Sequence, residues 1–289
     1  MLLLAVIGGL DWLARAIPKC VIRGIQFGLG LQLASVALAK YVQSDGNAEI
    51  LLAVLAFVIS ILLLNNKRLP AALPVIGLGI LFALLVKSDA QKLSQPVVAI
   101  CLPQFSLIGI SDIITGFLLL SLPQIPLSIG NSVLATAQIT KDLFPARNVS
   151  VKKIGITYGI MNLIVPWFGG FPVCHGSGGL VGHYTFGGRT GGSVIIYGSV
   201  FLVLGDLFGK SFGHIINIFP LPMLGVLLLF ESLGLIYHSR DIAGEKTEFP
   251  ITILVGLIAA FLAYGFVIGM IIGVGIYYFK NRVNLTSDR

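Results

Sequence analysis

The run from Phe168 to His183 combines glycines, a proline and small polar side chains in an otherwise strongly apolar chain. An apolar helical pattern resumes inside this run, which predicts a helix that begins in the middle of a membrane. The first N–H groups of such a helix have no intrahelical partner, and they lie at the positive end of its dipole. The run therefore predicts a binding site for an anion, although its glycines could instead serve close helix packing. The residues expected to contact the ligand are Cys174, His175, Gly176, Ser177 and Gly178.

A second polar group lies in the stretch 122–132, where two prolines interrupt an apolar segment. Prolines in mid-span leave backbone carbonyls without their usual donors, and unpaired polar groups are costly in lipid. We therefore expect Gln124, Ser128 and Asn131 to flank the same anion site. The alternative is that these side chains form hydrogen bonds between helices.

Glu231 is the one carboxylate deep within an apolar run. An ionised side chain near the bilayer centre costs roughly 2.5–3.5 kcal/mol on the insertion scale. A role in proton coupling is one interpretation, and a neutral, paired or interfacial carboxyl group is the other.

The chain shows no sign of enzyme, metal or cofactor chemistry. The residues around His175 lack the first glycine of a nucleophile elbow, and no phosphate loop or dinucleotide fingerprint occurs. Cys174 and His175 are adjacent in sequence, and adjacent residues rarely supply a complete metal ligand set. We therefore expect no catalytic residue, no metal and no cofactor.

Composition places the protein in the lipid bilayer. Of its 289 residues, 56% are hydrophobic and only 11% are charged, whereas soluble domains carry about 25% charged residues. Apolar runs of nearly 20 residues recur, which predicts an all-α, polytopic transmembrane protein. The helices are expected at 1–17, 21–40, 48–64, 70–87, 109–140 (broken near Pro123 and Pro126), 152–168, 173–187 (a half-helix), 191–208, 214–238, 250–263 and 264–280.

The net charge of +7 is explained by topology and not by nucleic-acid binding. Alternating the expected helices across the membrane puts all but four of the 19 basic residues on one side; the exceptions are Lys40, Lys87, Lys92 and Lys210. The positive-inside rule then predicts a cytoplasmic C-terminus. The last two helices share about 30 residues around Gly265, so they are expected to form a tight hairpin or to cross obliquely.

Four segments resemble one known family, the molybdate transporters, which form a branch of the sulfate permease (SulP) superfamily. They are 17–34, 122–145, 161–192 and 219–235. The resemblance implies two inverted repeats of seven helices, in which two half-helices point their N-termini at the substrate. It assigns 1–17 and 105–210 to a core domain, 18–90 and 211–280 to a gate domain, and 281–289 to a cytoplasmic tail.

By this resemblance the chain begins within the fourth helix, so the first three helices and one half-helix are expected to be missing. The expected function is transport of a tetrahedral oxyanion, most readily molybdate, across the plasma (inner) membrane by alternating access. Sulfate is the alternative substrate, and a chain that is inactive without a partner supplying the missing helices is a third interpretation. The resemblance also leaves a homodimer open.

Overall fold

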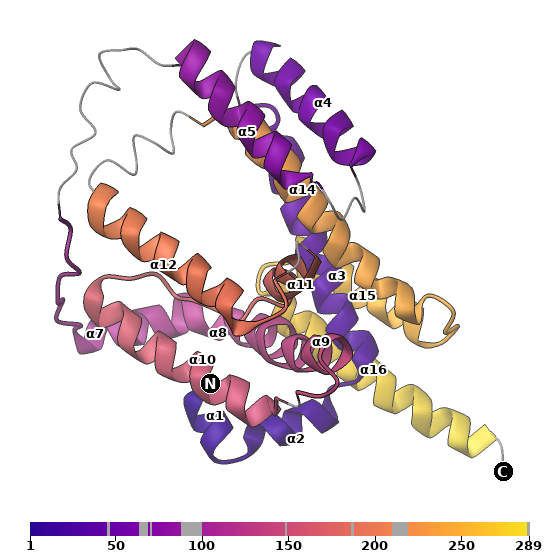
Figure 1. Ribbon diagram of the computed structural model, residues 1–289. Helices are drawn as coiled ribbons and strands as arrows, with labels where there is room; N and C mark the ends of the chain where they lie inside the picture. Colours follow the sequence, from indigo (N-terminus) through magenta and orange to yellow (C-terminus); the bar gives the residue numbers. More distant parts are fainter. Residues whose placement is uncertain are drawn as a thin grey trace. The chain divides into compact units, whose positions relative to one another are not determined.

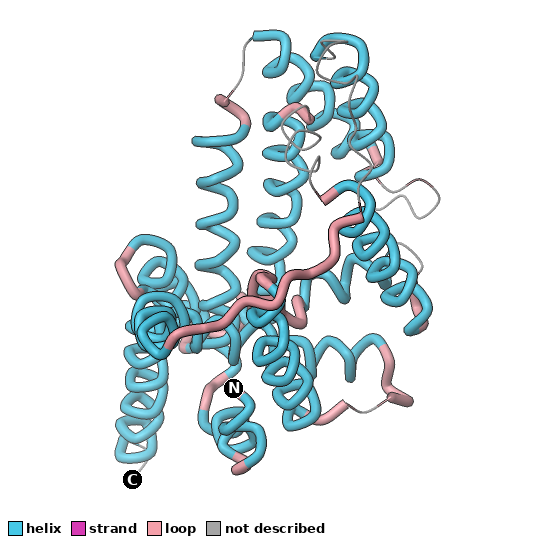
Figure 2. Tube along the Cα trace, turned by 90° about the vertical axis from the view of Figure 1, so that its left-hand side faces the viewer, coloured by secondary structure: helices cyan, strands magenta, loops and turns pink. Residues whose placement is uncertain are grey.

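The structure of the chain is a computed structural model that describes residues 1–44, 47–63, 69, 71–87, 100–147, 149–185, 188–209 and 219–287. Within these ranges all regular secondary structure is helical (Figures 1 and 2), which confirms the predicted all-α class. Among the described residues, three segments are long and apolar enough to cross a bilayer: Lys19–Tyr41, Gly191–Phe208 and Leu221–Ile242. A fourth results if the bent pair Ile110–Ser121 and Gln124–Lys141 counts as one span. The protein is therefore an integral membrane protein, as predicted.

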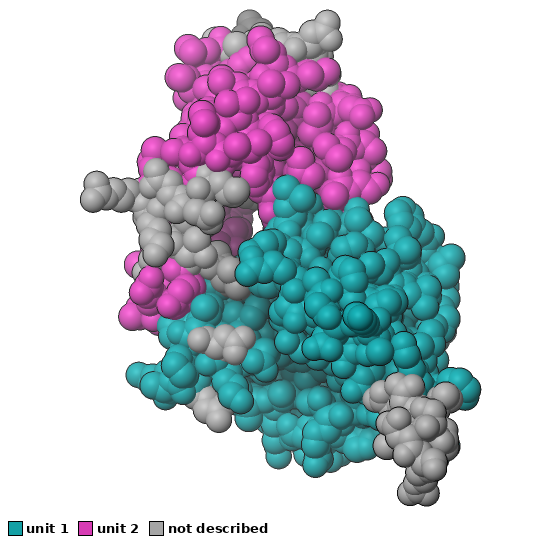
Figure 3. Space-filling model, turned by 90° about the vertical axis from the view of Figure 1, so that its right-hand side faces the viewer, with its two compact units in different colours: residues 1–32, 104–181, 232–289 teal, residues 33–103, 182–231 magenta. Residues whose placement is uncertain are grey.

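The chain divides into two compact units, which Figure 3 colours separately. Unit 1 comprises Met1–Gln32, Gln104–Val181 and Ser232–Arg289, and unit 2 comprises Leu33–Pro103 and Gly182–Glu231. Each unit has its own cluster of buried apolar side chains. The expected core and gate domains are groups of helices that move together, and that division stays a prediction.

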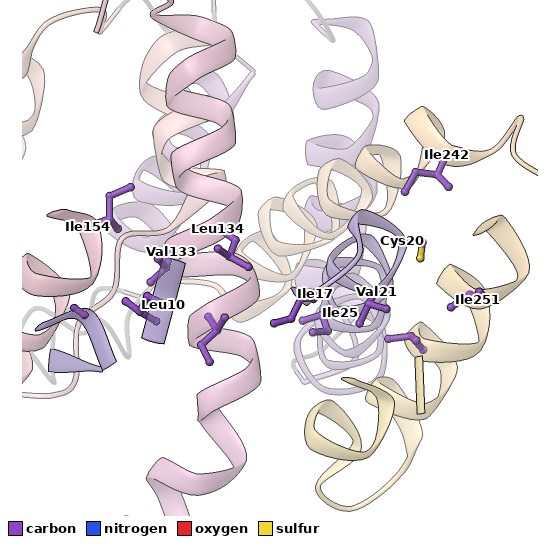
Figure 4. Close-up of a cluster of buried hydrophobic side chains, with 13 residues drawn as sticks. Leu10, Ile17, Cys20, Val21, Ile25, Val133, Leu134, Ile154, Ile242 and Ile251 are labelled. Atoms are coloured by element: carbon purple, nitrogen blue, oxygen red, sulfur yellow. The ribbon is translucent and has the colours of Figure 1, made fainter. Parts of the chain in front are cut away.

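Helix α3 (Lys19–Val36) lies in the middle of the apolar cluster of unit 1 (Figure 4). It packs closely on α15 (Glu248–Phe261), because Gly24 and Gly28 present no side chain at the contact. A Cβ atom on Gly28 would lie 2.6 Å from the Cβ atom of Ala259. Small residues allow helix backbones to approach one another in this way inside membranes.

The last two helices form the tight hairpin that was one of the two expectations. Helix α15 is followed by α16 (Gly265–Ser287), and Tyr264 takes a positive φ of 57° in the turn between them. Three glycines of α16 then lie against α15, namely Gly265, Gly269 and Gly273; a Cβ atom on Gly269 would be 3.1 Å from the carbonyl oxygen of Val255.

The single helix expected at 1–17 is in fact two short helices. Helix α1 (Leu2–Val6) and helix α2 (Gly9–Ala16) are separated at Gly8, whose φ of 78° interrupts helical geometry. Helix α1 packs on α10 (Val151–Ile164) at Gly159, where a Cβ atom would lie 2.6 Å from the Cβ atom of Leu2. This contact fixes the position of α10, and α10 carries several polar residues of the candidate site.

The predicted broken helix at 109–140 is confirmed. Its two halves meet at an angle of 63° beside Pro123. Its second half contains a π-helical stretch directly after Pro126, and such wide turns often occur at functional sites. In chain order the elements are α7 (Ile110–Gly116), η3 (Phe117–Ser121), α8 (Leu122–Leu127), η4 (Ser128–Ala135) and α9 (Thr136–Leu143).

Unit 2 is built from long apolar helices around a second buried cluster, which includes Ala56, Val75 and Met223. All the residues of α12 are at least partly exposed, and most of its large apolar side chains lie on the surface of the structure. The helix expected at 214–238 is described only from Leu221 onward. The elements of unit 2 are the end of α3, η1 (Ala37–Tyr41), α4 (Asn47–Leu62), α5 (Ala72–Phe82), η2 (Ala83–Lys87), the end of α11 (Ser177–Thr185), α12 (Gly191–Phe208) and most of α14 (Leu221–Tyr237).

Candidate anion-binding site

The half-helix exists, but it begins at Ser177 and not at residue 173. Residues 171–176 have no helical structure, and two features explain why. Pro172 disfavours helical geometry in the residue before it. In addition, Asn162 on α10 binds both backbone groups of Val173: its Nδ2 donates to the Val173 oxygen at 2.8 Å, and the Val173 N–H donates to its Oδ1 at 3.0 Å.

The start of α11 presents a row of free backbone donors. The N–H of Leu180 donates to the oxygen of Gly176 at 3.1 Å, which is the first intrahelical bond. The N–H groups from Gly176 to Gly179 precede that bond, and none of them donates to another group among the described residues. Gly179 is exposed, and a Cβ atom placed on it would meet nothing within 4 Å. Space for a ligand therefore lies beside the donors.

The broken helix supplies the second side of the site through Asn131 in η4. The hydroxyl of Ser177 is fully buried and donates to Asn131 Oδ1 at 2.6 Å. This bond joins the π-helical stretch to the first residue of α11. The Ser177 hydroxyl is thus used within the protein, and its backbone N–H is one of the donors that have no intrahelical partner.

Two threonines and a tyrosine hold the residues around this junction. Thr136 on α9 donates to the backbone oxygen of His175 at 2.9 Å, and the Thr157 hydroxyl lies 2.9 Å from His175 Nε2. On the same helix as Thr157, the hydroxyl of Tyr158 lies 2.9 Å from that of Ser128. Helix α10 therefore contacts the broken helix and also residues 173–176, which lead into α11 and are called the approach to α11 below.

The structure brings most of the predicted site residues together in unit 1. Hydrogen bonds connect the neighbourhoods of Ser128, Asn131, His175 and Ser177, and Gly176 and Gly178 flank Ser177 in the chain. Cys174 is exposed directly before them as a free thiol.

Two predicted residues lie apart from this network. Gln124 is exposed on α8, and no described hydrogen bond joins it to α11. Glu231 is exposed on α14 and belongs to unit 2.

Sequence reasoning missed four residues of the network: Thr136, Thr157, Tyr158 and Asn162. The last three lie on α10, where they are the polar residues that follow Lys152 and Lys153, and their polar side chains in an apolar stretch were the signal that could have pointed to them.

The site contains no carboxylate, lysine or arginine among the side chains that make these bonds. Its polar groups are backbone N–H groups, hydroxyls, the Asn131 amide and the His175 imidazole. Among the described residues, no group of three His, Cys, Asp or Glu side chains is placed to hold a metal ion. Such a site attracts an anion through oriented dipoles, as helix N-termini do elsewhere.

Comparison with solved structures identifies the fold. The chain resembles the transmembrane domain of the cyanobacterial bicarbonate transporter BicA, with a TM-score of 0.60 and 19% sequence identity over 90% of this chain and 73% of that one. This likeness confirms the predicted sulfate-permease-like fold.

Comparison of sequences identifies the relatives. Residues 116–235 match a family model described as "Molybdate transporter of MFS superfamily". "Molybdate transporter 2" of Arabidopsis thaliana is 33% identical over 94% of this chain and 68% of the relative. "Molybdate transporter 1" of the same plant is 42% identical over 53% of this chain and 34% of the relative. "Molybdate transporter 1" of Chlamydomonas reinhardtii is 31% identical over 71% of this chain and 40% of the relative.

The signature stretches that suggested the family, 122–145 and 161–192, form the two sides of the candidate site. From the extent and identity of these matches, the chain belongs to the molybdate transporter family.

Proposed function

We propose that this protein transports molybdate and that the anion binds at the start of α11. The observation that carries the proposal is the row of free N–H groups from Gly176 to Gly179, at a helix that begins inside a membrane protein. A dianion satisfies these donors and interacts favourably with the helix dipole. The names of the relatives supply the substrate, since each of the three is called a molybdate transporter.

The residues around the donors of α11 are assigned their roles in anion binding from their positions in the structure. Asn131 keeps its side-chain amide beside the donors while its Oδ1 accepts from Ser177. Ser128 and His175 hold the broken helix and the approach to α11, and the exposed Gln124 and Cys174 flank the path of the anion.

Transport is proposed to follow alternating access, with the core segments moving against the gate segments. We place the protein in the plasma membrane with its C-terminus in the cytoplasm, because the basic residues gather on that side. Glu231 is the proposed proton-coupling group, since it is an exposed carboxylate on a membrane-spanning helix.

Sulfate is the second candidate substrate, because the donors of the site would bind either anion. Backbone N–H groups and hydroxyls recognise a tetrahedral dianion without regard to its central atom. Uptake of labelled molybdate in the presence of excess sulfate separates the two. Strong inhibition of molybdate uptake by the excess sulfate would show that sulfate binds at the same site, and unchanged uptake would show that the site selects molybdate.

A pair of variants at Gly179 tests the site itself. The position has room for a side chain, so Gly179→Asp adds a negative charge beside the donors and Gly179→Asn adds a neutral side chain of the same shape. Two unit charges at 4 Å repel by about 4 kcal/mol near a protein surface. We therefore expect Gly179→Asp to lower molybdate uptake more than tenfold relative to Gly179→Asn.

Alkylation of Cys174 gives a second, independent readout. This thiol is exposed next to the donors, so bound molybdate should slow its reaction with a maleimide, as followed by mass spectrometry of the peptide. Equal uptake by the two Gly179 variants, together with unchanged alkylation in saturating molybdate, would exclude this site.

A further inference from the structure

A second feature of unit 1, separate from the donors of α11, is a cavity of about 460 Å³. It is lined by the end of α2, the start of α3, the end of η4, α9 and the residues at the start of α10, and it is open on one side. Three cationic side chains line it: Lys19, Arg23 and Lys141. None of the residues assigned to the anion site lines this cavity.

The cavity keeps a surplus of positive charge. One nearby carboxylate, Asp241, binds two of the cations: its Oδ2 lies 2.8 Å from Lys19 Nζ and 2.6 Å from an Arg23 guanidinium nitrogen. Lys141 is exposed and forms no ion pair with any carboxylate in the described part of the chain. Three cations less one carboxylate leave a net charge of +2.

The positive end of a helix adds to this charge. Helix α10 begins at Val151, which lines the cavity, and Ser150 caps the helix by accepting from the N–H of Lys153 at 3.2 Å. The N-terminus of a 14-residue helix carries a partial positive charge. The polar part of the cavity therefore suits a phosphate group.

The remaining wall of the cavity is apolar, and this decides which phosphate compound fits. Ile17, Ile22 and Leu134 line it together with smaller aliphatic residues. Lys19 is the first residue of a segment long enough to span the membrane, so the cavity lies at the depth of lipid headgroups. A free hydrated anion gains nothing from apolar walls, whereas a phospholipid has both a phosphate and an apolar glycerol ester region.

We propose that this cavity binds the headgroup of an anionic phospholipid. The phosphate lies between Lys141 and Arg23, and the ester region contacts the aliphatic side chains. Basic pockets between membrane helices recognise lipid headgroups by the same combination of charge and depth. The bound lipid links the start of α3 to α9, both of which contribute to the cavity.

Native mass spectrometry of the full chain in detergent tests this proposal, with short-chain phosphatidylglycerol and phosphatidylcholine as the probes. We expect the wild-type chain to prefer phosphatidylglycerol. The loss of one cation near a headgroup weakens lipid binding by about fivefold. Lys141→Gln should therefore bind phosphatidylglycerol about fivefold more weakly than the wild-type chain does. Lys152→Gln is the matched control, because Lys152 is exposed on the same end of α10 without lining the cavity.

Three results would overturn the proposal. Equal binding of the two lipids to the wild-type chain would show that the headgroup is not recognised, and this measurement needs no variant. An equal loss in Lys141→Gln and Lys152→Gln would indicate a general surface field in place of a site. Displacement of phosphatidylglycerol by inorganic phosphate or molybdate at the same concentration would assign the cavity to free anions.

Discussion

Asn162 is the residue that we expect to control where α11 begins. Its side chain makes both hydrogen bonds to Val173, at 2.8 and 3.0 Å, and its Nδ2 also donates to the Tyr158 oxygen at 3.0 Å. The bonds to Val173 hold the chain extended immediately before Cys174, so that the free donors follow in a fixed position. Asn162→Ala removes both bonds while it leaves the helix donors themselves unchanged.

The magnitude follows from the two bonds lost. A side-chain hydrogen bond inside a membrane protein contributes about 0.6–1 kcal/mol, so the pair contributes about 1–2 kcal/mol. If this energy keeps the approach to α11 ordered, its loss reduces the binding-competent fraction by about 5–30-fold. We therefore expect KM for molybdate uptake to rise by up to that factor in Asn162→Ala, while the variant still folds.

The assay combines uptake in proteoliposomes with the alkylation rate of Cys174. Loosening of residues 173–176 should change the alkylation rate in Asn162→Ala in the absence of substrate. Thr157→Val is a graded comparison, because it keeps the shape of the side chain and the Asn162 bonds while it removes the 2.9 Å contact with His175. The bonds that the Thr157 hydroxyl donates to the Lys153 and Ile154 oxygens within α10 are lost with it. A folded Asn162→Ala protein with wild-type KM and wild-type alkylation would refute the positioning role.

Two further predictions concern stability. Gly28→Leu should lower the free energy of unfolding by about 1–3 kcal/mol, because its Cβ atom would lie 2.6 Å from that of Ala259 and the helices cannot separate without loss of packing. Gly77→Leu is the control, since nothing lies within 4 Å of a Cβ atom at that position. Equal Tm values for the two variants would contradict the close α3–α15 contact. Asp241→Asn should destabilise unit 1 by about 1–2 kcal/mol, a value kept low because the carboxylate is 34% exposed. The variant removes the negative charge beside Arg23, whose side chain is only 13% exposed and whose other hydrogen-bond partner is Gln26 Oε1. An unchanged thermal unfolding curve in detergent would show that the ion pair contributes nothing.

The membrane class and the broken helix were predictable because each depends on local chemistry. Few charged residues and repeated apolar runs exclude a soluble fold whatever the tertiary structure is. Pro123 interrupts a helix by its own covalent geometry, and the bend lies beside it. The glycines and the proline before Ser177 similarly predicted a half-helix.

The exact start of that helix was not predictable, because it depends on a contact between helices. Residues 173–176 have no local property that forbids a helix, and it is the binding of Val173 by Asn162 that keeps them extended. The break in the first helix was missed for a different reason. A glycine within an apolar run does not by itself show whether the chain takes a positive φ there, as it does at Gly8.

The sequence by itself determined that the protein lies in a membrane, that two of its helices are interrupted, and that small donors gather at one interruption. These properties follow from residue types and short-range backbone geometry. Only the tertiary structure decided that α10 forms hydrogen bonds to both interrupted regions, and that the Ser177 hydroxyl binds Asn131 and leaves the backbone donors free. It also decided that Asp241 forms ion pairs with two of the cations beside a basic cavity. Those pairings join residues far apart in the chain, and their geometry is set by helix packing, which no local pattern specifies.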